Sequence, residues 1–439
     1  MLMSSSLSGC FGRDEVSQKQ EQVIGELIIF NDDGAYTWFQ DERAIISDGK
    51  IIIGSVASGN NDSNRTGDIE IVTYDLTTGI TQLSELHHNL EYDDHDSPAL
   101  LVRQDGRYLA VYSTHMGTHP LANTIHYRIS TNPYDSSSWE PELTFVPSNN
   151  SRVTYSNLHF LQDENENNGR IYNFFRGLNN SWNPSIMVSD DMGENWDALG
   201  LLIQHPGHRP YVKYASDETD TIHFIFTEGH PRNYNNSIYH AYYRDGMLHS
   251  SNGSEIRLLG DGPIQIGEGT LVFQGGQSAV ASGNDLAIDS NGHPYLAYSV
   301  QIDENPFDHR YRYSRWTGDE WLDYEIAFAG ERLYSGEDDF TGNIALDPNN
   351  PAVVYISTNV NPVTGTLLPS GHYEIFQGRT NDDGMNWDWV PITENSTEDN
   401  IRPIVPNWDG QNTAVIWLQG TYDRYTDFNL KVVGVIISE

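Results

Sequence analysis

The chain has 439 residues, of which 24 are Lys or Arg and 62 are Asp or Glu, so its formal net charge is −38. A surface this acidic argues against nucleic acid and anionic membranes as partners and is typical of marine or halophilic proteins, which stay soluble in high salt. The single cysteine excludes disulfide bonds, and no apolar run approaches the length of a transmembrane helix.

The first 24 residues contain a short sequence that resembles an export signal. Leu7-Ser8-Gly9-Cys10 resembles a bacterial lipobox, in which the cysteine becomes the lipidated first residue of the mature protein. The segment before it is short and lacks Lys and Arg, so a chance match is the alternative. We expect residues 1–24 to be a lipobox remnant with a polar tether, and residues 25–439 to form one domain. The expected protein is an exported monomer, either secreted or attached to the outer membrane of a Gram-negative bacterium through a lipid on Cys10.

After this segment, a pattern of short strands recurs seven times. An apolar strand is followed by an Asp/Asn/Gly turn and then by a second strand that ends in small or polar residues. The second strands start at Ile51, Tyr108, Ile171, Thr221, Pro294, Ala352 and Ala414. Repeats of this length that contain only strands are typical of propellers, whose blades cannot bury their faces alone. We therefore predict an all-β, single-domain, seven-bladed β-propeller.

Two further details support this fold. The first strand of the first blade is expected to begin at Thr37, and the apolar residues after Glu26 to supply the outer strand of the last blade, closing the ring. Ser189–Trp196 and Thr380–Trp387 resemble Asp-box hairpin turns, in which Asp satisfies turn amides and Gly takes a positive φ. Asp boxes are structural, so we assign them no chemistry.

Ionisable side chains gather at the strand ends of three consecutive blades. In an antiparallel sheet, the start of one strand and the end of the next lie at the same edge. The residues at such positions are His95, His115, Tyr155, Arg176, His208, Arg209, Tyr211 and His230. Each alone has a simpler role in a turn, an ion pair or packing, but their coincidence in adjacent blades favours one site. Later blades offer mostly amides there, including Gln301, with Arg402 as the exception.

These side chains suit one chemistry better than others. Glycoside hydrolysis normally needs two carboxyl groups across the bond. β-Elimination of a uronic acid polymer instead needs an Arg to neutralise the sugar carboxylate and His or Tyr to move protons. No cofactor is needed for that chemistry. The spacing of His208, His223, His230 and His240 could hold a structural zinc or calcium ion.

At these residues the chain resembles the seven-bladed propeller ulvan lyases. The resemblance rests on NDDGAYTWFQDERA from Asn31, DDHDSPALLV with His115 after it, FFRG, HRPYVKYASD and TEGHP. It implies cleavage of ulvan, a sulfated algal polysaccharide, between sulfated rhamnose and a uronic acid, leaving an unsaturated uronyl end. It also implies His95 as the principal acid/base with His115 beside it, Tyr155 as the partner acid/base, and Arg176 or Arg209 as the neutraliser. The substrate contacts that we expect are Asp94, Asn157, His208, Tyr211, His230, Gln301 and Arg402.

Two other functions fit parts of the sequence. A sialidase-like hydrolase would share the Asp-box turns, but it needs an arginine triad and a Phe-Arg-Ile-Pro opening, which FQDERA from Phe39 is not. A non-catalytic carbohydrate-binding propeller would repeat one site in every blade, whereas here the ionisable groups cluster in three. Only a lyase would create a conjugated double bond.

Overall fold

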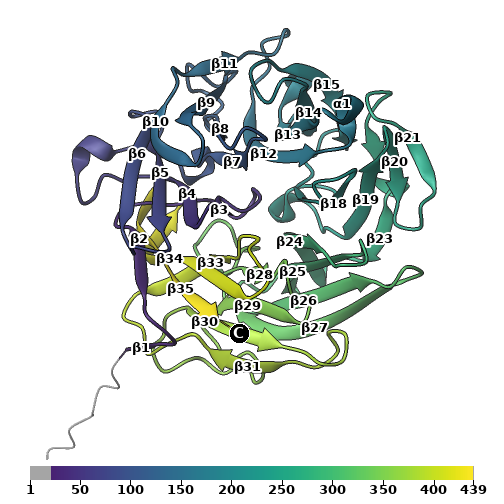
Figure 1. Ribbon diagram of the computed structural model, residues 1–439. Coiled ribbons are helices and arrows are strands. Elements are labelled where there is room, and N and C mark those ends of the chain that lie inside the picture. The colour runs from purple at the N-terminus through teal and green to yellow at the C-terminus, as the bar shows by residue number, and fades with distance from the viewer. Residues whose placement is uncertain (1–20, 439) are drawn as a thin grey trace, which may run out of the picture.

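The computed structural model describes residues 21–438, which form a ring of seven antiparallel sheets around a central axis (Figure 1). Each sheet is a blade with its first strand innermost. Blade 1 contains β3 (Ala44–Ser47), β4 (Lys50–Val56), β5 (Ile69–Asp75) and β6 (Thr81–His87). Blade 2 contains β7 (Ala99–Val102), β8 (Tyr108–Tyr112), β9 (Ile125–Asn132), β10 (Asp135–Trp139) and β11 (Leu143–Phe145). Blade 3 contains β12 (Thr154–Leu161), β13 (Arg170–Arg176), β14 (Pro184–Ser189) and β15 (Asp197–Leu201).

The remaining blades follow the same order along the chain. Blade 4 contains β17 (Val212–Ser216), β18 (Thr221–Phe226), β19 (Ile238–Arg244), β20 (Met247–Ser250), β21 (Glu255–Leu258) and β23 (Thr270–Phe273). Blade 5 contains β24 (Ala279–Ile288), β25 (Pro294–Ile302), β26 (His309–Trp316) and β27 (Trp321–Gly330). Blade 6 contains β28 (Ile344–Leu346), β29 (Val353–Thr358), β30 (Glu374–Arg379) and β31 (Asp388–Pro391). Blade 7 contains β33 (Asp399–Ile404), β34 (Asn412–Arg424), β35 (Asp427–Ser438) and, from the other end of the chain, β2 (Ile28–Asn31).

The remaining elements are short. Two small sheets pair β1 (Gln22–Val23) with β32 (Thr393–Glu394) and β16 (Ile203–Gln204) with β22 (Ile264–Gln265). The helical turns are α1 (Glu164–Asn167), η1 (Ser63–Arg65), η2 (Asp94–Asp96), η3 (Leu178–Asn180), η4 (Pro231–Asn233) and η5 (Ile266–Glu268). None of the helices in residues 21–438 is long and apolar enough to cross a membrane.

Two sequence predictions about this ring are confirmed. The fold is an all-β, seven-bladed propeller, and the strand after Glu26 closes it, because β2 pairs antiparallel with β35 in blade 7. The blades bury their apolar faces against one another. At the contact between blades 3 and 4, for example, the buried Tyr172 hydroxyl donates to that of Tyr243 at 3.0 Å. The lipobox prediction for Cys10 lies outside the described residues.

The predicted strand from Thr37 is wrong over most of its length, since β3 begins only at Ala44. Residues 36–43 instead cross the axis and bond to four blades. Gln40 donates to the carbonyl of His95 at 2.9 Å, and Arg43 donates to that of Ser156 at 2.7 Å. Lys213 donates to the Gln40 carbonyl, and Glu42 accepts a bond from the amide of Val405. These bonds to the centre of the ring outweigh strand pairing, and they close the floor of the axial funnel.

The two Asp boxes are hairpin turns at the outer strands of their blades. Asp191, between β14 and β15, accepts bonds from the Ser189 hydroxyl and from the Asn195 amide. Asp382 makes the same bonds with Thr380 and Asn386 between β30 and β31. Both boxes are built from bonds within their own turns, as the sequence analysis expects.

Candidate active site

The structure brings the predicted residues of blades 2, 3 and 4 together at one end of the axial funnel. They come from η2, from the loop after β8, from the start of β12 and the end of β13, which lie side by side, and from the loops before β17 and after β18. Their strands place them there because each lies where an inner strand starts or its neighbour ends. The group consists of His95, His115, Tyr155, Arg176, His208, Arg209, Tyr211 and His230.

Two histidines share one buried carboxylate. The Nδ1 atom of His95 lies 2.6 Å from Oδ1 of Asp93, and the Nδ1 atom of His115 lies 2.8 Å from Oδ2 of the same residue. The two imidazole rings are stacked with their centroids 3.9 Å apart. Asp93 is completely buried, whereas the side chain of His115 is 23% exposed and that of His95 only 4%. Thus His115 is the member of the pair that a ligand can reach.

The shared carboxylate separates the protonation states of the two rings. Burial opposes a charge on His95, but Asp93 and Asp94 outweigh it and raise the pKa of His95 to about 10. Burial and the positive charge on His95 together lower the pKa of His115 below its usual range. At neutral pH, His95 is therefore an imidazolium and His115 is neutral. Since Nδ1 of His115 donates to Asp93, its Nε2 carries a free lone pair.

Tyr155 faces that lone pair. Its hydroxyl lies 3.4 Å from Nε2 of His115. Tyr155 has a positive φ of 65°, at an irregularity in the β12–β13 pairing. A left-handed conformation in a residue other than Gly costs about 1–3 kcal/mol and is often found at functional sites. Burial, with a smaller contribution from Tyr211, raises the pKa of Tyr155 well above 10, so the phenol remains protonated.

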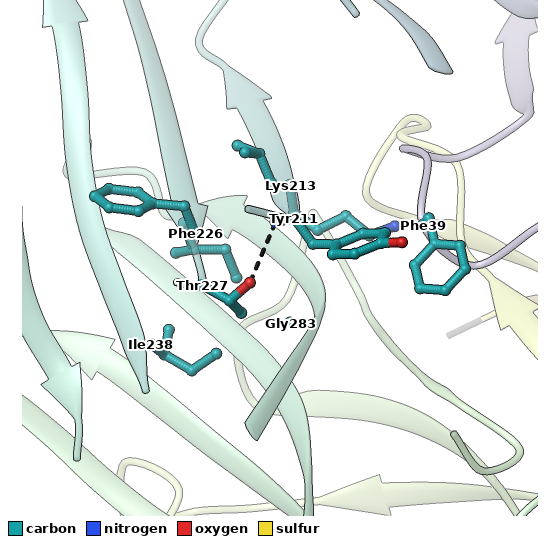
Figure 2. A pocket seen from close by; sticks show the side chains of 9 residues that line it. Phe39, Tyr211, Lys213, Phe226, Thr227, Ile238 and Gly283 are labelled. Atoms are coloured by element: carbon teal, nitrogen blue, oxygen red, sulfur yellow. Dashed lines mark hydrogen bonds between the residues drawn. The ribbon is translucent and has the colours of Figure 1, made fainter. Parts of the chain in front are cut away.

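Aromatic rings pack against His95 and Tyr211. Phe39, on the segment that crosses the axis, packs on His95 at 5.6 Å and on Tyr211 at 4.5 Å between ring centroids. Figure 2 shows the ring of Phe39 beside that of Tyr211, whose backbone amide donates to Thr227 at 3.2 Å. The role of Phe39 could not be predicted from the sequence. Its segment was expected to form a strand, and nothing in the sequence indicates that the segment crosses the axis.

A cationic hollow opens beside the histidine pair. Its volume is about 250 Å³, and it is lined by Arg152, Arg176, Arg209, His115 and Trp182, among others. Within the described part of the chain, none of these arginines forms an ion pair with a carboxylate, although the protein is strongly acidic. A second hollow of about 360 Å³, lined by His208 and His230, shares Trp182 and Arg209 with the first. Arg152 and Trp182 were missed because they lie in loops without a repeating pattern.

Arg176 is the most firmly placed of these cations. Its guanidinium lies over the ring of Tyr211 at 4.2 Å and over that of Tyr155 at 4.7 Å. One of its nitrogens donates to the carbonyl of Pro210 at 3.0 Å. The other donors of the guanidinium remain available to a ligand in the hollow.

Two acidic residues, Glu337 and Asp339, lie near these cations and are called the acidic wall below. Glu337, between β27 and β28, pairs with Arg232 at 2.6 Å and lies 3.5 Å from Nε2 of His230. Burial, together with Glu337 and Asp338, raises the pKa of Asp339 to about 7. Burial and the nearby arginines lower the pKa of His230 to about 2, so its ring is neutral. Sequence reasoning missed this wall because its loop carries no strand signal.

Four of the predicted substrate contacts, Asp94, Asn157, Gln301 and Arg402, are buried and bond to other parts of the protein. Arg402 is 1% exposed, and its guanidinium pairs with the buried Asp94 at 2.7 Å. Asn157 is buried and accepts a bond from the backbone amide of Asp41 at 2.8 Å. The buried Gln301 donates to the carbonyl of Asp338 at 2.9 Å. Nε and Nη2 of Arg402 and Oδ1 of Asp94 have no hydrogen-bond partner among the described residues. The role of these four side chains in binding substrate therefore stays a prediction.

The proposed group of metal-binding histidines does not form. His223 and His240 are buried in blade 4, where Nδ1 of the first lies 3.0 Å from Nε2 of the second. His208 stacks on His205, and His230 faces the acidic wall. Because the four rings point to different partners, the structure does not support a site built from this set.

Comparison with known proteins agrees with this architecture. The chain is 22% identical over 316 residues to the ulvan lyase PL25 of Pseudoalteromonas sp. (strain PLSV), in an alignment that covers 63% of this chain and 62% of that relative. The chain therefore spans less than two thirds of the curated relative's length. A solved PL25 ulvan lyase bound to -[GlcA(1-4)Rha3S]- superimposes with a TM-score of 0.68 at 17% identity, over 95% of this chain and 98% of the other. The polysaccharide lyase Uly1 superimposes with a TM-score of 0.58 at 12% identity, over 96% and 100%.

These similarities confirm the resemblance to propeller ulvan lyases that the sequence motifs indicate. The model of a family described as "BNR repeat-containing family member" matches residues 58–329, which is more than half of the chain. On this match, the protein belongs to the BNR repeat-containing family.

Proposed function

We propose that this protein is a polysaccharide lyase that cleaves an ulvan-type polymer of sulfated rhamnose and uronic acid by β-elimination. The observation that carries the proposal is the neutral His115 facing the protonated Tyr155 at 3.4 Å, beside a hollow lined by three arginines. The similarity to ulvan lyases supports the choice of substrate.

The reaction begins with neutralisation of the uronate carboxylate. Arg176 has free donors that face the hollow and a position fixed by two tyrosine rings, so we assign it the bidentate grip. Arg209 and Arg152 add positive charge on the rim of the same hollow. Neutralising the carboxylate acidifies the C5 proton and stabilises the charge that develops in the transition state.

Proton transfer then uses the two groups that face each other. Nε2 of His115 removes the C5 proton, and the electron pair of that C–H bond forms the double bond between C4 and C5. The bond from C4 to its oxygen breaks, and the hydroxyl of Tyr155 supplies the proton to the departing oxygen. Asp93 holds His115 in the tautomer with a free Nε2. Burial, together with the charge on His95, lowers the pKa of His115 and keeps it from being protonated beforehand.

The geometry also favours one uronic acid. Base and acid are only 3.4 Å apart, so they serve the same face of the sugar ring. The C5 hydrogen and the C4 oxygen lie on the same face in glucuronate and on opposite faces in iduronate. We therefore propose that glucuronate units are cleaved and iduronate units are not.

A hydrolase remains the second candidate because Glu337 and Asp339 form a carboxyl pair near the site, with ligand atoms within 4.8 Å of one another. Each has a buried oxygen without a hydrogen-bond partner. These oxygens are shielded from the funnel, whereas a retaining glycosidase holds its two carboxyl groups about 5–5.5 Å apart across an accessible sugar. The pair therefore supports hydrolysis less well than His115 and Tyr155 support elimination.

The deciding experiment is digestion of ulvan with the purified protein, followed by ultraviolet absorbance and mass spectrometry of the products. A lyase yields fragments with a conjugated double bond, whereas a hydrolase adds water and yields saturated ends. His115→Ala should abolish the absorbance change while the protein stays folded, and Asp339→Asn should retain it. Saturated products, or no cleavage of any uronic acid polymer, would refute the proposal.

The assignment of Arg176 has its own test. Lys cannot reproduce a bidentate grip, so Arg176→Lys should lower kcat by about 10²–10³-fold, as expected for loss of one preorganised donor. Arg209→Lys keeps the rim charge but loses hydrogen-bond donors, so it should raise KM modestly and leave kcat nearly unchanged. Steady-state kinetics of the two variants on ulvan give the comparison. If Arg209→Lys carried the larger loss in kcat, Arg209 would be the neutraliser.

A further inference from the structure

A second cluster of histidines lies outside the candidate active site, at the contact between blades 1 and 2. His87 ends β6 in blade 1, and His126 lies in β9 of blade 2. Glu142, in the link between β10 and β11, reaches between them, and Tyr112 at the end of β8 completes the group. Sequence reasoning assigned no role to these histidines, because they are far apart in the chain and fit no metal-binding motif.

All of these side chains direct a polar atom at one carboxylate. Nδ1 of His87 lies 2.6 Å from one oxygen of Glu142, and Nδ1 of His126 lies 3.0 Å from the other. The hydroxyl of Tyr112 lies 2.7 Å from the first oxygen. One potential ligand atom from each of His87, His126 and Glu142 lies within 4.8 Å of the others. Two imidazoles and a carboxylate are a ligand set that zinc commonly uses.

The tautomer of His126 is not fixed by its second ring nitrogen. His126 is 2% exposed, and its Nε2 atom has no hydrogen-bond partner among the described residues. A buried histidine normally has its tautomer fixed by a partner on the second nitrogen. Moving the ring proton to Nε2 would free the Nδ1 lone pair to bind a metal, and the bond to the metal would have to offset the cost of a buried N–H without an acceptor.

We infer that His87, His126 and Glu142 bind one zinc ion that joins blades 1 and 2. Zinc bonds to imidazole nitrogen and to carboxylate oxygen are about 2.0–2.2 Å long, so tetrahedral ligand atoms lie about 3.3 Å apart. The observed N–O separations need to open by less than an ångström. The side chains of His87 and Glu142 are 23% and 21% exposed, so the fourth position can be filled by water. Calcium is disfavoured because it prefers oxygen ligands.

The position of this cluster links it to the candidate active site. The strand that ends at His87 leads into the loop that carries Asp93, and the strand that ends at Tyr112 leads to His115. An ion between these strands would stiffen the bases of both catalytic loops. It would act on stability and positioning, because neither histidine of the cluster lies in the cationic hollow.

The test uses the full-length protein, stripped with a chelator, exposed to Zn²⁺ and passed over a desalting column before metal analysis. Wild type should retain one zinc per chain and unfold at a higher temperature than the stripped form. His87→Ala and Glu142→Gln should retain none and show no zinc-dependent rise. His88→Ala is the matched control, since His88 is adjacent but 62% exposed and should retain the ion.

A second control separates this cluster from the catalytic histidines, which also group with a carboxylate. His115→Ala should retain zinc as wild type does. Cobalt(II) gives an independent readout, because a tetrahedral site gives intense visible absorption bands, which His87→Ala should lose even if it folds normally. Absence of bound zinc in wild type, retention by His87→Ala, or loss in His115→Ala would each overturn the inference. None of these outcomes depends on lyase activity. The zinc site can therefore be refuted while the proposed function holds, and the proposed function can be refuted while the zinc site holds.

Discussion

At the scale of single residues, the chemistry depends on how the Asp93 carboxylate gives two neighbouring rings different protonation states. Its two oxygens bind Nδ1 of His95 and Nδ1 of His115 separately. The result is one imidazolium and one neutral imidazole at the same pH, in stacked rings that would otherwise be equivalent. Paired groups whose environments push their pKa values apart commonly mark acid and base roles.

This division predicts the pH dependence of activity. The pKa of His115 is lowered below 6.5, so the base is lost only when the pH falls below that range. The pKa of His95 is raised to about 10, and deprotonation there removes the charge that orders the pair. We expect kcat/KM on ulvan to rise through an acid limb below pH 6.5, to stay level, and to fall near pH 10. Tyr155→Phe should lower the level region by about 10²–10⁴-fold without moving the acid limb. An acid limb above pH 7 in wild type would contradict the neutral state of His115.

At the scale of elements, the blades themselves could be predicted from the sequence and the axial segment could not. Strand alternation and turn residues identify β4 and its six counterparts, because a half-buried strand needs that pattern. Residues 36–43 begin with the aromatic side chains typical of a strand, yet bonds from Lys213 and to Ser156 hold the segment across the axis. His95, His115, Tyr155 and Arg176 could be predicted as one group, because the topology alone puts these strand ends at the same edge of neighbouring blades. The pairing of Arg402 with Asp94 could not be predicted, because the two residues are 308 positions apart and only the closed ring brings them together.

The Asp-box turns should contribute to stability and not to activity. Asp191 binds the Asn195 amide at 2.8 Å within the β14–β15 turn. Asp191→Ala should lower the free energy of unfolding by about 1 kcal/mol, the usual net value of such bonds. Denaturant titration measures this loss, and Asp197→Ala, at an exposed position in the following strand, is the control. A loss of turnover in folded Asp191→Ala would mean that the turn reaches the catalytic funnel.

Ring closure by β2 has a sharper test. Phe30 is 3% exposed and packs edge-on against Tyr74 of blade 1 at 5.3 Å, whereas its neighbour Ile29 is 53% exposed. Phe30→Ala should destabilise the protein by about 3–5 kcal/mol, the usual cost of removing a buried Phe ring. Ile29→Ala should change stability by only about 0.5 kcal/mol, the usual range for an exposed position. Similar melting temperatures for the two variants would show that the β2–β35 pairing contributes little to closing the ring.

At the scale of the whole molecule, a net charge of −38 surrounds a hollow lined by unpaired arginines. The long-range field therefore repels a sulfated polyuronate, and attraction begins only at close range. Screening acts mainly on the long-range part, because exposed charges interact over a Debye length of about 8–10 Å in moderate salt. A close, partly buried contact with Arg176 is screened much less.

This balance predicts a salt optimum. Adding salt from a very low level should first raise kcat/KM, because screening the overall repulsion speeds the encounter, and should lower it only when contacts at the rim are also screened. Arg152→Ala removes one rim cation, so its optimum should move to higher salt while kcat changes little. Arg176→Ala should lose activity that no salt concentration restores, since the loss lies in the transition state. The check is kcat/KM on ulvan across a sodium chloride series for the three proteins. If the wild-type value fell steadily from the lowest salt, attraction at long range would dominate, and the cationic hollow would control the encounter despite the acidity of the rest of the surface.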